Sequence, residues 1–546
     1  MTVFTPTILV DGTALDPSYD ILAIDVIREV NRIPRASITF AGGDPPQQRY
    51  PLADSGLLAP GKLLEIRVRY EDGDGETRLF EGPILRIAFD VGAEGVTLTV
   101  EASDAAHRLT QGRRSVIFTN SRDTDAVRRI VEAAGLAVGA IPSSSPVHPY
   151  LVQYDCTDWD FILSRADVVG LLVLAEDGRI SLKPMAPDGA PDATFEFGRD
   201  EILECALELD ASRQNPKVES YAWDLAQQRR TRAISGRAPH LTQGNLHPDS
   251  LGASLDLGTW QLVHMAPLPP EELQSWADAR LTRRRQAMIR GRLTVRGRAP
   301  LPPLGLAELR GMGKTFSGKA LVSGVRQRLT PGDWRTDLQF GLAPDGFIYQ
   351  QDVLDAEAAG LLPAVRGIQI GIVERYEADP LNEYRLRVSL PAIGGSDGAS
   401  LWARLATPEA GKDHGFFFRP KPGDEVVVGF LNDDPRQPIV LGSLYGSKNA
   451  PGGDFAELSA ANEHKGIATA KGAGLAFRDK DKPALTLRTP RGRLEIDDDG
   501  KRIELSDGDG NTIRLDAGGI TIKSAKDLAI EAAGKITVKG KAVDIA

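Results

Sequence analysis

Residues 494–522 are LEIDDDGKRIELSDGDGNTIRLDAGGITI, a segment in which one short pattern recurs. Two apolar residues are separated by one other residue, and a polar turn follows them. Period-two alternation is typical of a strand with one buried face, and a regular spacing of such strands indicates a repeat architecture. The pattern extends beyond this segment, through Leu485/Leu487, Leu494/Ile496, Ile503/Leu505, Ile513/Leu515, Ile520/Ile522, Leu528/Ile530, Ile536/Val538 and Val543/Ile545.

The spacing of this repeat restricts how it can fold. Successive pairs lie 7 to 10 residues apart, whereas the repeats of single-chain solenoids contain about 20 residues or more. Three chains wound together would supply the three sides of each coil. We therefore expect a triple-stranded β-prism, a trimer whose core is formed by the pairs from Leu494/Ile496 to Val543/Ile545. The alternative is a run of β-hairpins in a monomeric sheet, with turns at 497–500 and 507–510.

The bulk composition is that of an ordinary globular chain with several domains. A chain of 546 residues is too long for a single hydrophobic core. The content of 41% hydrophobic and 26% charged residues excludes disorder of the whole chain. The net charge of -10 argues against a nucleic-acid binder. Because no secretory signal and no apolar run of ~20 residues are seen, we expect the chain to be made and folded in the cytoplasm.

Two cysteines, Cys156 and Cys205, are too few for a disulfide framework. Both stand beside apolar residues, so we expect them to be small core fillers. A structural disulfide between them is the alternative.

The chain divides into segments with different patterns, and the expected fold class is mainly β. Alternating apolar residues predict strands from residue 1 to about 110 and again from about 289 to 342. Helix starts are predicted at Thr124, Thr157 and Pro269. Five alternating runs in the next 90 or so residues indicate a small closed barrel. The expected segments are a first β unit at 1–110, a helical or mixed insertion at 111–215, a second β unit at 216–345, a linker at 346–363, the barrel at 364–450, a connector at 451–473 and a needle at 474–546.

No residues have the spacing of a catalytic or metal site. The seven histidines lack metal-ligand spacing, and no acid pair is set apart for hydrolysis, so neither cofactor, metal nor enzymatic activity is expected. Acidic neighbours and a helical setting favour ion pairs between subunits, or a solvated face, over nucleic-acid binding for the main basic patch. This patch comprises Arg280, Arg283, Arg284, Arg285, Arg290 and Arg292.

Residues 417–430, FFRPKPGDEVVVGF, and 433–445, DDPRQPIVLGSLY, resemble an OB-fold signature. This signature is similar to the OB-fold signature of the VgrG family and its relatives, which are the baseplate hub and spike proteins of contractile phage tails and extracellular contractile injection systems. Residues 33–40, IPRASITF, and 154–161, YDCTDWDF, are similar to segments of the family's hub. The signature residues are Pro420, Gly423, Asp424, Val426, Val428, Phe430, Asp434, Pro435, Pro438, Gly442, Leu444 and Tyr445.

The resemblance implies a trimeric part of an injection machine. The two N-terminal β units would be tube-like barrels, so that three chains would present six barrels to a hexameric inner tube. It also implies contacts with baseplate proteins, with a PAAR-type tip protein on the needle end, with effector cargo and, transiently, with a target membrane. The protein would assemble in the cytoplasm and be expelled toward the target envelope as part of an injection particle.

Two other functions stay open. One is an envelope-degrading spike enzyme, although residues 454–473 are too few for the lysozyme domain of some spikes, and no effector domain is expected after Ala546. The other is a trimeric glycan-binding tail fibre or adhesin, which would share the repeat but lack the OB barrel. The residues do not distinguish a type VI secretion system, an extracellular particle and a phage.

Overall fold

The computed structural model describes residues 3–73, 75–93, 95–224, 227–236, 238–264, 267–298, 301–349, 364–392, 400–457 and 459–545. The chain forms two compact units, 1–355 and 356–546, which are described separately. The expected linker at 346–363 contains a 3-10 turn, η2 (Phe347–Tyr349), and its residues 350–363 lie outside the described ones.

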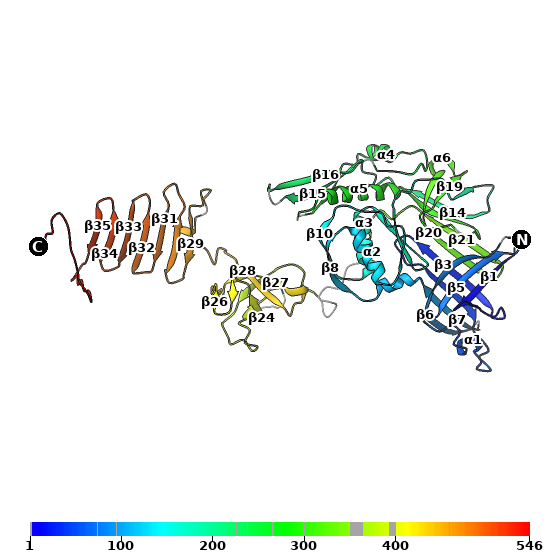
Figure 1. The fold of residues 1–546 in the computed structure, drawn as a ribbon, viewed down its shortest axis with the longest axis horizontal. Coiled ribbons are helices and arrows are strands. Elements are labelled where there is room, and N and C mark those ends of the chain that lie inside the picture. Colours follow the sequence, from blue (N-terminus) through cyan, green and yellow to red (C-terminus); the bar gives the residue numbers. More distant parts are fainter. Residues whose placement is uncertain are drawn as a thin grey trace. The chain divides into compact units, whose positions relative to one another are not determined.

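One sheet of 13 strands runs through the first unit (Figure 1). Its order is β14–β18–β21–β20–β3–β4–β7–β6–β5–β1–β2, with β19 pairing to β20 and β13 to β19. The strands are β1 (Phe4–Val10), β2 (Thr13–Ala14), β3 (Ile21–Glu29), β4 (Arg35–Ala41), β5 (Leu63–Tyr70), β6 (Thr77–Gly92), β7 (Gly95–Ser103), β13 (Ala193–Glu196), β14 (Ile202–Leu209), β18 (Ile289–Arg296), β19 (Leu306–Arg310), β20 (Gly318–Thr330) and β21 (Asp333–Phe340).

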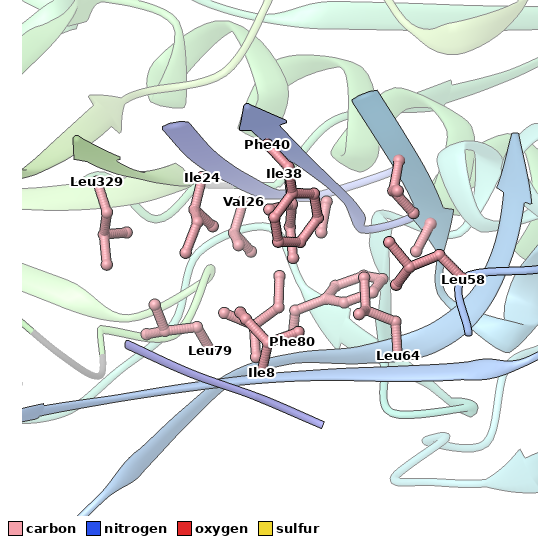
Figure 2. Packing of buried hydrophobic residues seen from close by; sticks show 14 of the residues in the cluster. Ile8, Ile24, Val26, Ile38, Phe40, Leu58, Leu64, Leu79, Phe80 and Leu329 are labelled. Carbon is pink, nitrogen blue, oxygen red and sulfur yellow. The ribbon is translucent and has the colours of Figure 1, made fainter. Parts of the chain in front are cut away.

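The two expected β units meet inside this sheet. Strand β20 pairs antiparallel with β3, from Gly324 opposite Glu29 to Leu329 opposite Ile24. Leu329 therefore joins the hydrophobic core of the first β unit (1–110), so one continuous sheet connects the two β units within residues 1–355. Figure 2 shows this core, with Ile8, Ile24, Val26, Ile38, Phe40, Leu58, Leu64, Leu79, Phe80 and Leu329 packed together.

Smaller sheets and the helices make up the rest of the first unit. β8 pairs with β10, β12 lies between β11 and β9, and β15 lies between β16 and β17. These elements are α1 (Pro51–Asp54), η1 (Ala105–Thr110), β8 (Arg114–Ser121), α2 (Asp123–Ala133), β9 (Ala137–Val138), β10 (His148–Cys156), α3 (Asp158–Val168), β11 (Leu171–Glu176), β12 (Arg179–Pro184), β15 (Val218–Asp224), β16 (Arg229–Ile234), α4 (Pro248–Ser254), β17 (Trp260–Val263), α5 (Pro270–Gln286) and α6 (Gly313–Phe316).

Two of the three predicted helix starts are confirmed. The Thr157 hydroxyl caps α3 by accepting a hydrogen bond from the Asp160 backbone N–H at 3.1 Å, and α5 begins at Pro270. The prediction that Thr124 caps a helix is wrong. Helix α2 begins at Asp123, because the preceding residue takes the extended N-cap conformation with φ -77 and ψ 160, and this places Thr124 inside the first turn.

The arginine cluster of α5 is buried within the chain. Arg280 and Arg283 both pair with Asp167 of α3, Arg280 at 3.1 Å, and Arg285 pairs with Asp249 at 2.7 Å. The expected solvated face or pairs between subunits are therefore wrong for these three arginines. Packing of α5 against α3 removes the guanidinium groups of Arg280 and Arg283 from water. In all three cases a carboxylate of the same chain compensates the charge.

Both cysteines are free thiols, so the disulfide considered above is not formed. Cys156 packs as a partly buried residue against the core that contains α2 and α3. Cys205 is exposed rather than a core filler, because it lies on β14 at the edge of the large sheet.

The second unit begins with a closed barrel of five strands, which confirms the barrel predicted at 364–450. A two-stranded ribbon and a short turn accompany it. The order around the barrel is β22 (Gln369–Val373), β23 (Leu386–Ser389), β24 (Ser400–Leu405), β28 (Pro438–Ser443) and β27 (Glu425–Phe430); the ribbon is β25 (Ala410–Gly411) and β26 (His414–Gly415), and the turn is η4 (Leu431–Asp433).

The second unit ends in a seven-stranded antiparallel sheet, in which each strand pairs with the next along the chain (Figure 1). The sheet starts at His464, inside the range expected as a connector. Within 464–523, neighbouring strands of the one chain described pair with each other, as in the hairpin alternative. Its elements, after η5 (Gly453–Phe455), are β29 (His464–Ala468), β30 (Gly474–Arg478), β31 (Ala484–Arg488), β32 (Gly492–Asp497), β33 (Arg502–Asp507), β34 (Thr512–Asp516) and β35 (Gly519–Lys523).

Candidate assembly interface

Strand register stacks the predicted apolar pairs into two continuous rows. Because alternate residues of a strand point to the same face, the two rows form one apolar face of the C-terminal sheet. The first row is Leu487, Leu494, Leu505, Ile513 and Ile522, and the second is Leu485, Ile496, Ile503, Leu515 and Ile520. We call these ten residues the apolar face.

Aspartate side chains at the strand ends build the turns that set this register. The Asp507 carboxylate accepts hydrogen bonds from the backbone N–H groups of Asp509 and Asn511, each at 2.9 Å. The Asn511 side chain bonds the same carboxylate and holds the pKa of Asp507 below its ordinary value. The Asp516 carboxylate accepts from the Gly518 backbone N–H at 2.8 Å. Such side-chain turns reverse the chain locally, so each strand folds back on its predecessor.

The two faces of this sheet have inverted burial. Members of the apolar face from Leu487 to Ile522 are 38 to 71% exposed, whereas Glu495 and Asp497 on the opposite face are 8 and 9% exposed. Arginines cover the two acids: Arg502 pairs with Glu495 and Arg478 with Asp497, both at 2.9 Å. The charged face is therefore complete within one chain, while the apolar face is bare.

The bare face has an energetic cost in a single chain. Complete burial of a Leu or Ile side chain is worth about 1.5–3 kcal/mol. Because its members are exposed, the apolar face of a single chain lacks on the order of 10 kcal/mol of burial free energy. A partner that covers this face recovers that free energy.

The predicted core residues beyond Lys523 lie outside any strand of one chain. Among the described residues 524–545 no strand is formed, and Ile530 and Ile545 are 69 and 91% exposed. The Ala525 backbone N–H donates to Asn511 Oδ1 at 2.9 Å, which attaches this segment to the sheet. The remaining apolar residues here are Leu528, Ile536, Val538 and Val543, all exposed.

The first two strands of the sheet escaped the sequence prediction. Ile467 of β29 lies opposite Leu475 of β30, and Leu475 lies opposite Leu487, so the first row extends over all seven strands. Phe477 lies opposite Leu485 and lengthens the second row. The alternation of Leu475 and Phe477 was an available signal. Ile467 gave none, because the residues two positions before and after it, Lys465 and Thr469, are polar.

The OB-signature residues gather around one side of the barrel. Val426 and Val428 are fully buried, Phe430 packs against the same core, and Pro420 and Pro438 are buried. Gly423 occupies a turn with φ +88, a conformation that favours glycine. Asp424 accepts from the Lys421 backbone N–H at 2.7 Å, Gly442 lies opposite Val427 at a bulge, Pro435 is partly buried, and Leu444 and Tyr445 are exposed beyond β28.

Asp434 is the one buried acid of that signature. It accepts hydrogen bonds from the Arg436 backbone N–H at 2.8 Å and from its guanidinium at 2.6 Å. The Arg436 side chain, followed by that backbone bond, holds the pKa of Asp434 below its ordinary value. This carboxylate closes the turn between β27 and β28, which is a structural role.

Within the described ranges, no cluster of three or more His, Cys, Asp or Glu side chains is arranged to hold a metal ion. No helix in the part of the chain that the structure describes has the length and apolar character needed to cross a membrane. The apolar face is the part of the C-terminal sheet that one chain leaves exposed.

Three family models match the chain. Residues 1–331 match the Alg8 N-terminal domain, residues 369–445 match the Type VI secretion system/phage-baseplate injector OB domain, and residues 484–546 match the phage baseplate V C-terminal trimerisation domain. The second match coincides with the closed barrel, and the third contains the apolar face.

The chain is also similar to parts of known proteins. The chain is 37% identical over 93 residues to the type VI secretion system spike protein VgrG5 of Pseudomonas aeruginosa, covering 16% of this chain and 12% of that protein. It is 24% identical over 422 residues to VgrG1b of the same species, covering 72% of this chain and 54% of that protein. The prophage MuSo2 43 kDa tail protein of Shewanella oneidensis is 11% identical with a TM-score of 0.47, covering 63% of this chain and 99% of that one.

The matches to curated relatives are partial. The chain spans between 9 and 54% of the length of the curated relatives that it matches.

Proposed function

Because the chain belongs to the Alg8 N-terminal domain family and to the VgrG-type hub and spike proteins, we propose that three copies form the central spike of a contractile injection machine. The spike would connect a hexameric inner tube to a membrane-piercing needle. Its work would be mechanical, and no residue would have a catalytic role.

The observation that carries this proposal is the bare apolar face of the C-terminal sheet. Each strand from β31 to β35 contributes only two apolar residues to it, separated along the strand by ~7 Å. A face this narrow suits one side of a three-sided prism, in which three copies meet around a dry axis. The match of residues 484–546 to a trimerisation domain supports three copies rather than two.

The segment beyond Lys523 would complete the needle. Its apolar residues keep the spacing of the repeat, and one chain supplies no neighbouring strand for them. In the trimer, residues 524–545 would take their strand partners from the other copies, as the β-prism requires. Interwound strands leave no free edge, which would resist peeling when force is applied.

The first unit would be the hub. Its two β units share one sheet through β3 and β20, so a trimer presents six such units in a ring. This arrangement matches threefold to sixfold symmetry without a further protein. By family likeness, the hub would contact baseplate proteins and cargo, and the needle end would carry a PAAR-type tip. Assembly would take place in the cytoplasm, before expulsion toward the target envelope.

Binding of the purified full chain to inner-tube protein tests this proposal. We expect the chain to be retained by immobilised hexameric tube rings and not by a glycan array. Retention on glycans without retention on tube rings would overturn the proposal in favour of an adhesin.

A turbidity assay on cell walls tests the mechanical role: we expect no clearing, and clearing would show an envelope-degrading enzyme.

A further inference from the structure

The outward side chains of the OB barrel are sorted by strand. On β22, β27 and β28 they are mainly apolar, apart from Glu425 and Ser443 at the strand ends. They include Ile370 and Leu441, which are 44 and 53% exposed. On β23 and β24, positions that face outward are mainly polar, such as Arg387, Ser400 and Arg404. We call the apolar half the apolar wall; it consists of Ile368, Ile370, Ile372, Val427, Ile439 and Leu441.

The apolar wall is one continuous surface. Ile370 lies opposite Val427, and Gly429 of the same strand lies opposite Ile439. The Leu441 side chain closes the gap above Gly429, where its Cδ1 lies 3.3 Å from the position a Cβ would take. Apolar residues that neighbour one another on three adjacent strands form an exposed patch, and such patches mark interaction sites.

The barrel does not need this wall for its own core. That core lies on the opposite side of the same strands and contains Val373, Val426, Val428 and Val440, which are buried. An outward face that is apolar on three adjacent strands is unusual, because water normally selects polar residues there. The wall therefore indicates an interface.

We propose that the apolar walls of the three copies meet one another around the threefold axis, an inference that rests on the proposed trimer. Residues 444–463 connect each barrel to a sheet whose apolar face would lie at that axis. A surface that faces a threefold axis meets its own symmetry copies. Six residues are also far fewer than the roughly 20–30 per side of an independent interface, so the wall suits a contact between copies already held together by the sheet.

Cysteine cross-linking of the full chain tests this placement. Cys156 and Cys205 are first replaced by serine, since both are free thiols. Leu441→Cys then places a thiol on the wall, and Ser400→Cys places one on the polar half by an isosteric change. Treatment with a short bis-maleimide should join two of the three chains in each Leu441→Cys trimer, giving a dimer band on denaturing gels, while Ser400→Cys stays monomeric on the gel.

The outcomes separate this inference from the proposed function. A trimer in sedimentation that cross-links no more through Leu441→Cys than through Ser400→Cys would overturn the wall contact and leave the spike intact. A monomer in sedimentation for the cysteine-free parent would overturn the proposed spike itself.

Leu441→Asp provides a second readout. The concentration at which the trimer dissociates should rise by about tenfold or more, because three carboxylates would meet near the axis. An unchanged dissociation curve would refute the contact.

Discussion

Glu495 and Ile496 are neighbours on β32, and the charged residue is the more deeply buried of the two: Glu495 is 8% exposed and Ile496 is 38% exposed. The Glu495 carboxylate is paired with Arg493 and Arg502 on its own face of the sheet. Ile496 points to the other face, where one chain offers nothing to cover it. This inversion is the structural reason for placing further copies of the chain against the apolar face.

A single charge on the apolar face should abolish the trimer. In Ile522→Asp three carboxylates would meet near the axis, and each buried ion costs several kcal/mol. Native mass spectrometry of the full chain should then show monomers. The matched control is Thr521→Asp, one residue away on the outward face, which should remain trimeric; equal behaviour of the two variants would contradict the assignment of the faces.

The outer ion pairs of the sheet should matter little for assembly. Glu495→Gln removes the charge that Arg493 and Arg502 share, and ion pairs of this kind typically contribute about 1 kcal/mol or less. We expect the trimer to persist, with a small decrease in the thermal midpoint measured by circular dichroism. Dissociation of the Glu495→Gln trimer would show that this face, and not the apolar one, is the interface.

Asp167 should be essential for the stability of the first unit. It is the carboxylate that pairs with both Arg280 and Arg283, all three side chains being 4 to 6% exposed. Asp167→Asn would leave two buried guanidinium groups without a counter-charge, which typically costs about 3–5 kcal/mol. Urea unfolding measures this loss.

The control for that variant is Asp345→Asn. Asp345 pairs with Arg213 at 2.7 Å, but their side chains are 56 and 43% exposed, so the expected loss is at most about 1 kcal/mol. Similar losses for the two variants would contradict a structural role of the buried pair.

Acid should destabilise the barrel through Asp434. Its pKa is lowered in the folded chain by Arg436, so the carboxylate stabilises the fold above its unfolded pKa of about 3.9. That contribution is lost as the pH falls through the folded pKa. The thermal midpoint of the barrel transition should therefore fall below pH ~4, and it should fall less steeply in Asp434→Asn, whereas Asp413→Asn should keep the wild-type slope. Equal slopes for all three proteins would refute this role.

Alternation of apolar residues predicted the strands and the barrel because it reports which face of a strand is buried. It does not report which edge of a strand pairs with another. The junction of β3 with β20 joins residues about 300 positions apart in sequence, such as Arg326 with Asp25, and both strands have the same alternation whether or not they pair. The alternation therefore could not predict that β3 and β20 join the two β units in one sheet.

The arginine cluster shows a second limit. Arg280 and its neighbours form a basic run in the sequence, and a basic run is usually solvated. Their partner Asp167 lies on another helix, 113 residues from Arg280. Side-chain pairing over that separation depends on how α3 and α5 pack, so the burial of these charges emerged only from the structure.

In the C-terminal sheet, the register of the apolar pairs was predictable and the pairing scheme was not. The residues from Leu494 to Ile522 were expected on one face, and the structure places them there. Both a hairpin and an interwound prism use the same alternation. The aspartate turns, such as the one at Asp507, fold residues 464–523 back within one chain.

Sedimentation equilibrium of the full chain over a wide concentration range tests the trimer most directly. The structure predicts one species with three times the chain mass of 58.8 kDa, which persists on dilution because covering the apolar face recovers on the order of 10 kcal/mol per chain. A folded species with the mass of a single chain would show that the apolar face is stable in water and would contradict the spike.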